Sequence, residues 1–367
     1  MLALLAPGQG SQTPGFLAPW LEDANAAELI GNWSEVIGLD LKRLGTVADA
    51  DEIRDTANAQ PLLVAGGLIG AGQLFGENHS SISYTAGHSV GEITASVFAG
   101  VLDGDSAMKL VAARGAQMAI AAKGSDTGMS AVLGGERDVV VAAINAAGLT
   151  AANENGAGQI VAAGLLENLQ ALEANPPEGV RVRPLAVAGA FHTSYMESAH
   201  ARLAQLARSV SVRDPRTRVL SNADGAVVHS GREILDRMVS QISQPVRWDL
   251  CMKSMGELGV TADIEVPPAG TLVGLSKRAL PGVETLALKT PEDIPAAMDI
   301  IARHGFPSEL SDNPTWRMIV APFSGKFTHT DIQIGDEVSA GRIIGRVSNR
   351  QESVDLLSDH GGIVIEF

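Results

Sequence analysis

Cysteine is nearly absent from this sequence of 367 residues, which contains only Cys251. A single cysteine excludes an internal disulfide and any cysteine-cluster metal site, and we predict no metal site. The sequence also lacks a run of 18 apolar residues, so we expect no membrane span. The apolar opening at residues 1–6 has no basic flank, which favours a buried first strand over a signal peptide.

Basic residues are scarce as well, because 27 Lys and Arg stand against 42 Asp and Glu, giving a formal charge of −15. Such an acidic balance argues against nucleic acid as a partner. The chain is longer than one typical domain and has a globular composition, so we expect a large core with at least one satellite. The resulting expectation is a monomeric, cytoplasmic enzyme.

The most informative motif is Gly87-His88-Ser89-Val90-Gly91, which matches the G-x-S-x-G nucleophile elbow. An extended run at residues 82–85 precedes it, and we expect a helix to begin near Glu92. The two glycines let strand and helix approach closely while the serine adopts a strained backbone at the apex. We predict that Ser89 is a nucleophile and that the Val90 N–H stabilises an oxyanion. The alternative is a glycine-rich turn with an idle serine.

A second glycine turn, Pro-Gly-Gln-Gly-Ser-Gln at residues 7–12, follows the first strand. Open α/β folds keep their ligands at this edge of a parallel sheet. The pattern of a phosphate-binding loop is absent. We therefore consider the backbone N–H of Gln9 as a second oxyanion donor facing Ser89.

Arg114 lies in a helix predicted over residues 103–122, on the same face as its apolar residues. A buried guanidinium is costly unless it meets an anion. Two alternatives stay open from spacing alone: an ion pair with a buried Asp or Glu, or a clamp for a substrate carboxylate. Gln60, at the start of another predicted helix, either reaches the site or caps that helix.

A nucleophilic serine needs a general base, and His192 is the best placed of the eight histidines. It follows the end of a predicted strand, whereas His88 adjoins the serine and cannot easily fold back onto it. The other six lie in stretches that look exposed or helical. A purely structural histidine is the alternative.

Residues 125–193 alternate predicted strands and helices, which is typical of a small ferredoxin-like subdomain. Within this stretch, residues 153–159 are expected to form a turn-rich loop that could face the cleft. Beyond it, strands predicted at 262–266 and 284–288 alternate with helices at 272–279 and 291–304. The fold class that these patterns indicate is α/β.

Five motifs occur in a fixed order, namely residues 8–12, 87–92, Arg114-Gly115 with Met118, residues 189–192, and Gln244-Pro-Val-Arg-Trp248. Together they resemble the malonyl-CoA:acyl carrier protein transacylases of fatty-acid and polyketide synthesis, over residues 1–305. The resemblance implies a hydrolase-like core with a parallel sheet, formed by residues 1–124 and 194–304. The ferredoxin-like subdomain at residues 125–193 is then an insertion.

The resemblance also implies roles for single residues. Ser89 would be the nucleophile and His192 its general base, with the main-chain carbonyl of Gln244 orienting the histidine. Arg114 would bind the malonyl carboxylate bidentately. The remaining implied positions are Gln9 and Val90 in the oxyanion hole, and Phe191, Met118 and Asn153 at the substrate, with Phe191 at the bulky position associated with malonyl over methylmalonyl units.

The implied reaction is ping-pong transfer of a malonyl group from malonyl-CoA to the phosphopantetheine thiol of acyl carrier protein, through a malonyl-serine ester and without a covalently bound cofactor. The alternatives are a serine hydrolase or thioesterase acting on an acyl-CoA, a transacylase for another acyl group, and a non-catalytic carrier or scaffold. Basic clusters that could dock the carrier protein, or simply be solvated, are Arg181 with Arg183, Arg213 with Arg216 and Arg218, and Lys277 with Arg278.

The last part of the chain does not fit that family. Residues 305–316 have the composition of a linker. Residues 321–325 read Ala-Pro-Phe-Ser-Gly, residues 335–341 read Gly-Asp-Glu-Val-Ser-Ala-Gly, and an apolar run follows. These motifs resemble part of a biotinyl/lipoyl carrier domain over residues 317–367, which implies a small all-β segment. Gln351 occupies about the position of the lysine that carries the cofactor in such domains. We therefore predict no covalent biotin or lipoate on this chain.

Overall fold

The computed structural model describes residues 1–76, 79–187, 189–305, 319, 321–333, 336–339, 341–350, 352–358 and 362–364. The chain divides into two compact units, Met1–Asp312 and Asn313–Phe367. Most of the predicted linker and Gln351 lie outside the described residues. Among the helices of the described part, none has both the length and the apolar character needed to span a membrane.

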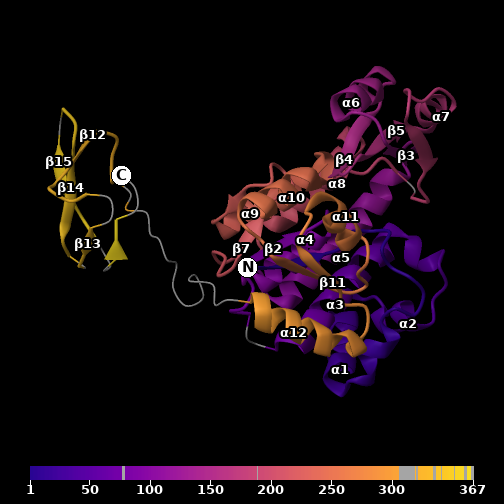
Figure 1. Ribbon diagram of the computed structural model, residues 1–367, viewed down its shortest axis with the longest axis horizontal. Coiled ribbons are helices and arrows are strands. Elements are labelled where there is room, and N and C mark those ends of the chain that lie inside the picture. Colours follow the sequence, from indigo (N-terminus) through magenta and orange to yellow (C-terminus); the bar gives the residue numbers. More distant parts are fainter. Residues whose placement is uncertain are drawn as a thin grey trace. The chain divides into compact units, whose positions relative to one another are not determined.

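The core of the first unit is a six-stranded sheet in the order β11-β10-β1-β2-β7-β8. All neighbouring strands pair in parallel except β7 and β8. Strand β1 is fully buried, as a central strand with helices on both faces requires (Figure 1). The strands are β1 (Leu2–Ala6), β2 (Tyr84–Gly87), β7 (Arg218–Leu220), β8 (Val227–Val228), β10 (Ala262–Glu265) and β11 (Glu284–Ala287).

Helices surround this sheet and enclose the largest hydrophobic cluster of the described part. Helix α3 is apolar on almost every side and packs against α4 and α5. A Cβ atom at Gly67 would lie 2.9 Å from the Thr94 side chain, so the glycine lets α3 pack closely against α4. The helices are α1 (Ala24–Ile37), α2 (Leu41–Thr46), α3 (Thr56–Phe75), α4 (Gly91–Phe98), α5 (Gly104–Ala122), α8 (Glu197–Ala207), α9 (Gly231–Ser240), α10 (Trp248–Glu257), α11 (Leu272–Ala279) and α12 (Ile294–His304), with short 3-10 turns η1 (Ala18–Glu22), η2 (Glu52–Arg54), η3 (Ser194–Met196), η4 (Gln241–Ser243) and η5 (Pro291–Asp293).

The inserted subdomain has the element order β-α-β-β-α-β and an antiparallel sheet in the order β6-β3-β5-β4, the ferredoxin-like arrangement. It follows α5 in the chain and stands at one end of the first unit in Figure 1. The elements are β3 (Thr127–Leu133), α6 (Arg137–Ala146), β4 (Thr150–Gly156), β5 (Gln159–Leu165), α7 (Leu166–Ala174) and β6 (Arg181–Pro184).

The prediction of a loop over residues 153–159 was wrong, because strand β4 extends to Gly156 and a tight turn then leads into β5. The Asn and Gly content of this stretch suggested a loop, but pairing with β5 on one side makes it a strand. On its other side β4 pairs in parallel with β9 (Val246–Arg247), a strand of the core segment.

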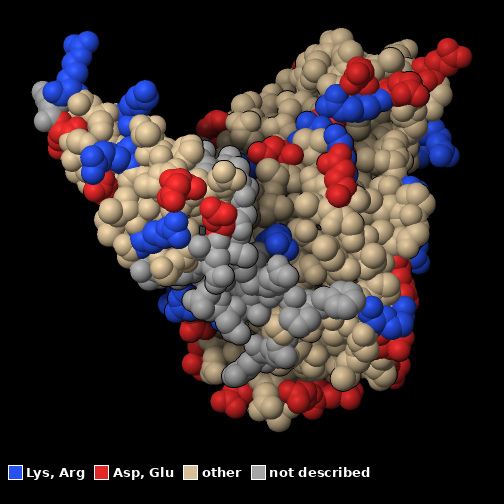
Figure 2. All heavy atoms as spheres, turned by 60° about the vertical axis from the view of Figure 1, so that its left-hand side comes forward, with Lys and Arg blue, Asp and Glu red and all other residues tan. Residues whose placement is uncertain are grey.

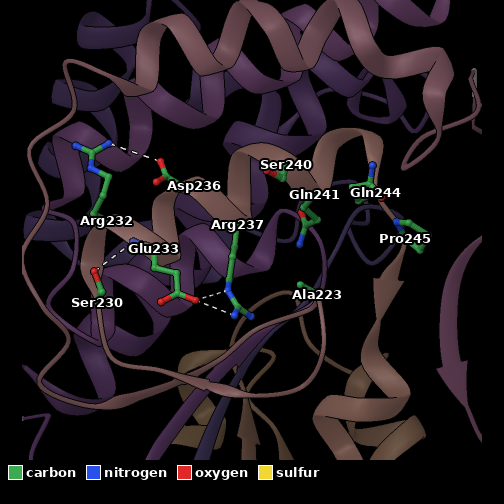
Figure 3. Close-up of a pocket in the computed structure, with 10 residues that line it drawn as sticks. All are labelled: Ala223, Ser230, Arg232, Glu233, Asp236, Arg237, Ser240, Gln241, Gln244 and Pro245. Atoms are coloured by element: carbon green, nitrogen blue, oxygen red, sulfur yellow. Dashed lines mark hydrogen bonds and ion pairs between the residues drawn. The ribbon is translucent and has the colours of Figure 1, made fainter. Parts of the chain in front are cut away.

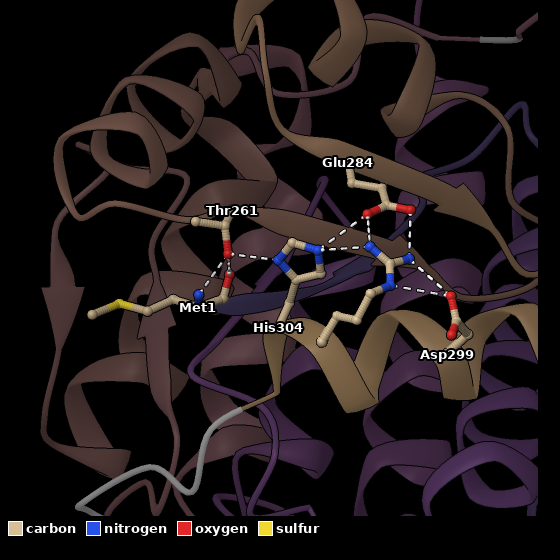
Figure 4. Close-up of polar contacts among 6 residues, drawn as sticks. Met1, Thr261, Glu284, Asp299 and His304 are labelled. Atoms are coloured by element: carbon tan, nitrogen blue, oxygen red, sulfur yellow. Dashed lines mark hydrogen bonds and ion pairs between the residues drawn. The ribbon is translucent and has the colours of Figure 1, made fainter.

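A polar network joins the edge of the core sheet to the last helix (Figure 4). The Met1 amino group donates to Thr261 Oγ1 over 2.7 Å, and the same hydroxyl lies 2.9 Å from His304 Nδ1. Arg303 pairs with Glu284 of β11. His304 therefore has a structural environment on α12, in keeping with its expected place in a helix.

The second unit is all-β within its described residues, as predicted. One sheet has the order β12-β14-β15 and a second pairs β13 with β16. The strands are β12 (Lys326–His329), β13 (Glu337–Val338), β14 (Ile343–Ser348), β15 (Ser353–Leu357) and β16 (Gly362–Ile363).

Candidate active site

Ser89 lies at the apex of a tight turn between β2 and α4, with a φ of +53°. A Cβ atom at Gly87 would come within 1.9 Å of the Gly91 backbone, and one at Gly91 within 2.1 Å of the Ala6 carbonyl. Neither position can hold a side chain, which is why the motif needs glycine on both sides of the serine. The positive φ at Ser89 is strain that the surrounding packing maintains.

His192 faces Ser89, with 2.8 Å between its Nε2 and the serine Oγ. Its other ring nitrogen, Nδ1, lies 2.7 Å from the main-chain carbonyl of Gln241. A carbonyl can only accept, so Nδ1 carries the proton and Nε2 is free to accept from the serine hydroxyl. Burial, and next the nearby Arg114 charge, lower the pKa of His192 to about 3. The imidazole is therefore neutral at pH 7.

The prediction that Gln244 orients the histidine was wrong by three residues. Gln241 opens the 3-10 turn η4, and its carbonyl points at His192, whereas Gln244 is the exposed residue at the end of that turn. Gln244 lines a pocket of about 480 Å³ together with Ala223, Arg237 and Pro245. Figure 3 shows these side chains. One turn of helix separates the two glutamines, and the sequence motif did not distinguish them.

Arg114 lies on α5 with 2% of its surface exposed, and its guanidinium extends to the Ser89 side chain. It donates to Gln60 Oε1 over 2.7 Å, to Gln241 Oε1 over 3.0 Å and to Ser89 Oγ over 3.3 Å. No described carboxylate lies within ion-pair distance of it. Burial lowers its pKa to about 10, so it stays charged at pH 7.

One of the two expected oxyanion donors, Val90, directly follows the serine, and the other, Gln9, lies in the turn after β1. A Cβ atom at Gly8 would lie 2.9 Å from the His88 carbonyl, so the turn containing Gln9 packs against the elbow. The Gln9 side chain is held by Thr56 Oγ1 at 3.1 Å. Within the described residues, neither the Gln9 nor the Val90 N–H donates to a protein acceptor. Both remain available for an oxyanion.

The expected substrate-binding residues occupy different positions. Phe191 precedes His192 and is buried, and Met118 lies on α5 beside Gln60, with 3.4 Å from its Sδ to Gln60 Nε2. Asn153 lies on β4, and its side-chain oxygen is buried without a described partner. Whether these three contact substrate stays a prediction.

Sequence reasoning missed three residues that hold the site together, namely Glu92, Asn222 and Gln241. Asn222 Oδ1 accepts from the Ser89 N–H over 2.8 Å, and its Nδ2 donates to the Gly87 carbonyl over 2.8 Å. Asn222 could have been predicted from its position in the sequence, because it follows strand β7, which pairs with β2, and so lies at the same edge of the sheet as Ser89. Among the described residues, no group of three His, Cys, Asp or Glu could hold a metal ion.

Comparisons with known proteins agree with this geometry. Residues 4–292 match the model of the acyl transferase domain. The chain is 50% identical over 296 residues to the malonyl CoA-acyl carrier protein transacylase of Mycobacterium tuberculosis H37Rv, covering 80% of this chain and 98% of that one. The Escherichia coli K12 enzyme of the same name is 30% identical over 305 residues, covering 81% and 99%.

Solved structures give the same picture. The crystal structure of MCAT from Mycobacterium tuberculosis superposes with a TM-score of 0.77 at 50% identity, over 80% of this chain and 98% of that one. A type II PKS acyl-carrier protein in complex with its malonyl-transacylase matches with a TM-score of 0.75 at 30% identity, over 81% and 99%. The chain belongs to the malonyl-CoA:acyl carrier protein transacylase family.

Proposed function

We propose that this protein transfers a malonyl group from malonyl-CoA to the phosphopantetheine thiol of acyl carrier protein, for fatty-acid synthesis. One observation carries the proposal: a buried guanidinium without a carboxylate partner among the described residues lies 3.3 Å from the serine Oγ. A planar fork in that position suits an acyl group that ends in a carboxylate.

In the first half-reaction His192 Nε2 takes the Ser89 proton as the Oγ attacks the thioester carbonyl. The oxyanion is stabilised by the Val90 N–H at the start of α4 and by the Gln9 N–H in the turn that follows β1. His192 then returns the proton to the sulfur as CoA leaves, and the malonyl group remains on Ser89 as an ester. In the second half-reaction the carrier thiol gives its proton to His192 and its sulfur attacks the ester carbonyl. The bond to Ser89 Oγ then breaks, His192 returns the proton to Oγ, and the malonyl group leaves as a thioester of the carrier protein.

The histidine environment supports transfer over hydrolysis by a standard triad. The Ser-His-Asp triad of a serine hydrolase has a carboxylate at Nδ1 of its histidine, whereas here the main-chain carbonyl of Gln241 occupies that position. Arg114 supports a malonyl over an acetyl substrate, because an acetyl group leaves the guanidinium without an anion. Phe191, Met118 and Asn153 are proposed to line the acyl pocket.

The carrier protein is proposed to dock on a local group of basic residues. Arg181 and Arg183 are exposed on β6, and Lys277 and Arg278 end α11. On the face of the first unit drawn in Figure 2, basic side chains alternate with acidic ones and form no broad basic patch.

A monomeric state and a cytoplasmic location remain part of the proposal. So does a division into a core (1–124, 194–304), an insertion (125–193), a linker (305–316) and a partial carrier-like segment (317–367).

The decisive experiment is the intact mass of the protein after brief incubation with malonyl-CoA, compared with Ser89→Ala. We expect one malonyl adduct on the wild type that carrier protein removes, and none on the variant. Steady CoA release without an adduct, or with water as efficient an acceptor as carrier protein, would instead establish a hydrolase.

A further inference from the structure

We propose that Glu92 is a positioning residue, which fixes the orientation of the Gln241 side-chain amide and thereby holds Arg114 ready for the substrate carboxylate. The inference rests on the proposed function and deepens it. The backbone N–H of Glu92 donates to the Ser89 carbonyl over 3.1 Å, but its carboxylate bonds to neither Ser89 nor His192 and belongs to a continuous chain of buried hydrogen bonds.

Glu92 lies in the first turn of α4 with 4% of its surface exposed. Its Oε2 accepts from Gln241 Nε2 over 2.7 Å, and its Oε1 accepts from the Asn222 N–H over 2.6 Å. At the other end of the same amide, Gln241 Oε1 accepts from Arg114 over 3.0 Å. The order in space is guanidinium, amide, carboxylate.

The two ends of this chain determine the direction of the amide. A guanidinium can only donate and a carboxylate can only accept, so the Gln241 oxygen must face Arg114 and its NH₂ group must face Glu92. Asn222 Oδ1 lies 3.0 Å from that NH₂ group and accepts from it too. The main-chain carbonyl of Gln241 meanwhile holds His192. One residue thus connects the carboxylate to both the clamp and the base.

A direct ion pair would stabilise Arg114 but would occupy the guanidinium that the substrate needs. The amide separates the two charges while keeping them close enough to interact, and it leaves Arg114 directed at Ser89. Burial raises the pKa of Glu92 to about 8, against the Asn222 hydrogen bond and the Arg114 charge. Both Glu92 oxygens accept hydrogen bonds from N–H donors, and they can do so whether or not the carboxyl carries a proton, so the direction of the Gln241 amide is the same at pH 7.5 and at pH 9.

The test compares malonyl-CoA and acetyl-CoA as acyl donors for Ser89, by intact mass and initial rates at pH 7.5 and pH 9. In Glu92→Gln, residue 92 has only one oxygen for two donors, so the Gln241 amide must turn or lose a bond. We expect the preference for malonyl over acetyl to fall at least about tenfold, mainly through a higher KM for malonyl-CoA. Glu197→Gln is the matched control, an exposed glutamate in the first turn of α8.

The exchange variant Glu92→Gln with Gln241→Glu keeps the net charge and restores donor and acceptor at every contact with Arg114 and the Asn222 N–H, but it places a carboxylate directly against Arg114. Because a direct ion pair occupies the guanidinium, we expect this variant to fold like the wild type and to keep the low malonyl preference of Glu92→Gln. A general loss of structure would instead lower the rates with both acyl donors alike.

Unchanged preference in Glu92→Gln, or an equal loss for both donors, would overturn the inference, and so would a wild-type malonyl preference in the exchange variant. If Glu92→Gln does not fold, the exchange decides alone: a folded protein without malonyl preference supports the inference, and a malonyl-selective or an unfolded one contradicts it. Failure of the wild type to form any malonyl adduct would contradict the proposed function itself, and is separate from these outcomes.

Discussion

The environment of His192 makes a sharp prediction about pH. Its pKa is lowered to about 3, first by burial and then by the Arg114 charge, from an ordinary value of 6.5. The pH dependence of kcat/KM reports the free enzyme. Acylation of Ser89 by malonyl-CoA should therefore keep its rate on the acidic side of neutrality, where most histidine-dependent enzymes lose theirs.

The size of the effect follows from the two pKa values. A histidine with pKa 6.5 is about 91% neutral at pH 7.5 and about 9% neutral at pH 5.5, so its rate would fall about tenfold. A histidine with pKa near 3 stays more than about 99% neutral at both, and the rate constant should change less than twofold. The same shift predicts a lower folding stability as the pH falls below 6.5, because only the unfolded state then binds the proton.

The assay is the initial rate of malonyl-Ser89 formation between pH 5.5 and pH 8, stopped with acid and measured by intact mass. Circular dichroism at each pH shows whether the protein is still folded, and jumps back to pH 7.5 identify irreversible loss. An acid limb with a midpoint near 6.5 in folded protein would refute the reasoning, since it would mean that water or substrate relieves the burial of His192.

Two further predictions concern buried charges. Arg114→Ala should lower kcat/KM for malonyl-CoA by roughly 100-fold to 1,000-fold, equivalent to about 3–4 kcal/mol for the lost charge-assisted hydrogen bonds, while kcat/KM for acetyl-CoA changes far less. Initial rates measured in parallel with the two acyl donors test this, and an equal loss with both donors would contradict it. Burial raises the pKa of Asp263 to about 7, so its carboxylate lowers folding stability as the pH rises through 7. The free energy of unfolding of Asp263→Asn should thus exceed that of the wild type at pH 8.5, by at most about 4 kcal/mol, and the difference should shrink toward pH 5. Denaturant unfolding curves at the two pH values measure this, and a difference that stays constant with pH would contradict the raised pKa of Asp263.

The elements around Ser89 were predictable because local chemistry determines them. The glycines at positions 87 and 91 leave no room for a side chain, so the motif could only be a strand–turn–helix apex. Arg114 was recognisable because a charged residue on an apolar helix face requires an explanation.

The glutamine that holds the histidine could not be predicted in the same way. Gln241 and Gln244 lie one turn apart in a short 3-10 segment, and their backbone carbonyls point in directions that only the tertiary fold determines. Strand β4 was missed for a related reason, since its pairing with β5 and β9 overrides the turn propensity of its Asn and Gly residues.

The ladder between β4 and β9 has a consequence for how the insertion could be changed. Asn153 pairs with Val246 and Glu154 with Arg247, so the inserted sheet has a strand borrowed from the core segment just after Gln241 and Gln244. Deleting the insertion would strip that segment of its backbone partners and disturb the turn that carries the Gln241 carbonyl. The ferredoxin-like part is therefore not an exchangeable module, and any variant of the insertion must keep the backbone register of β4 against β9.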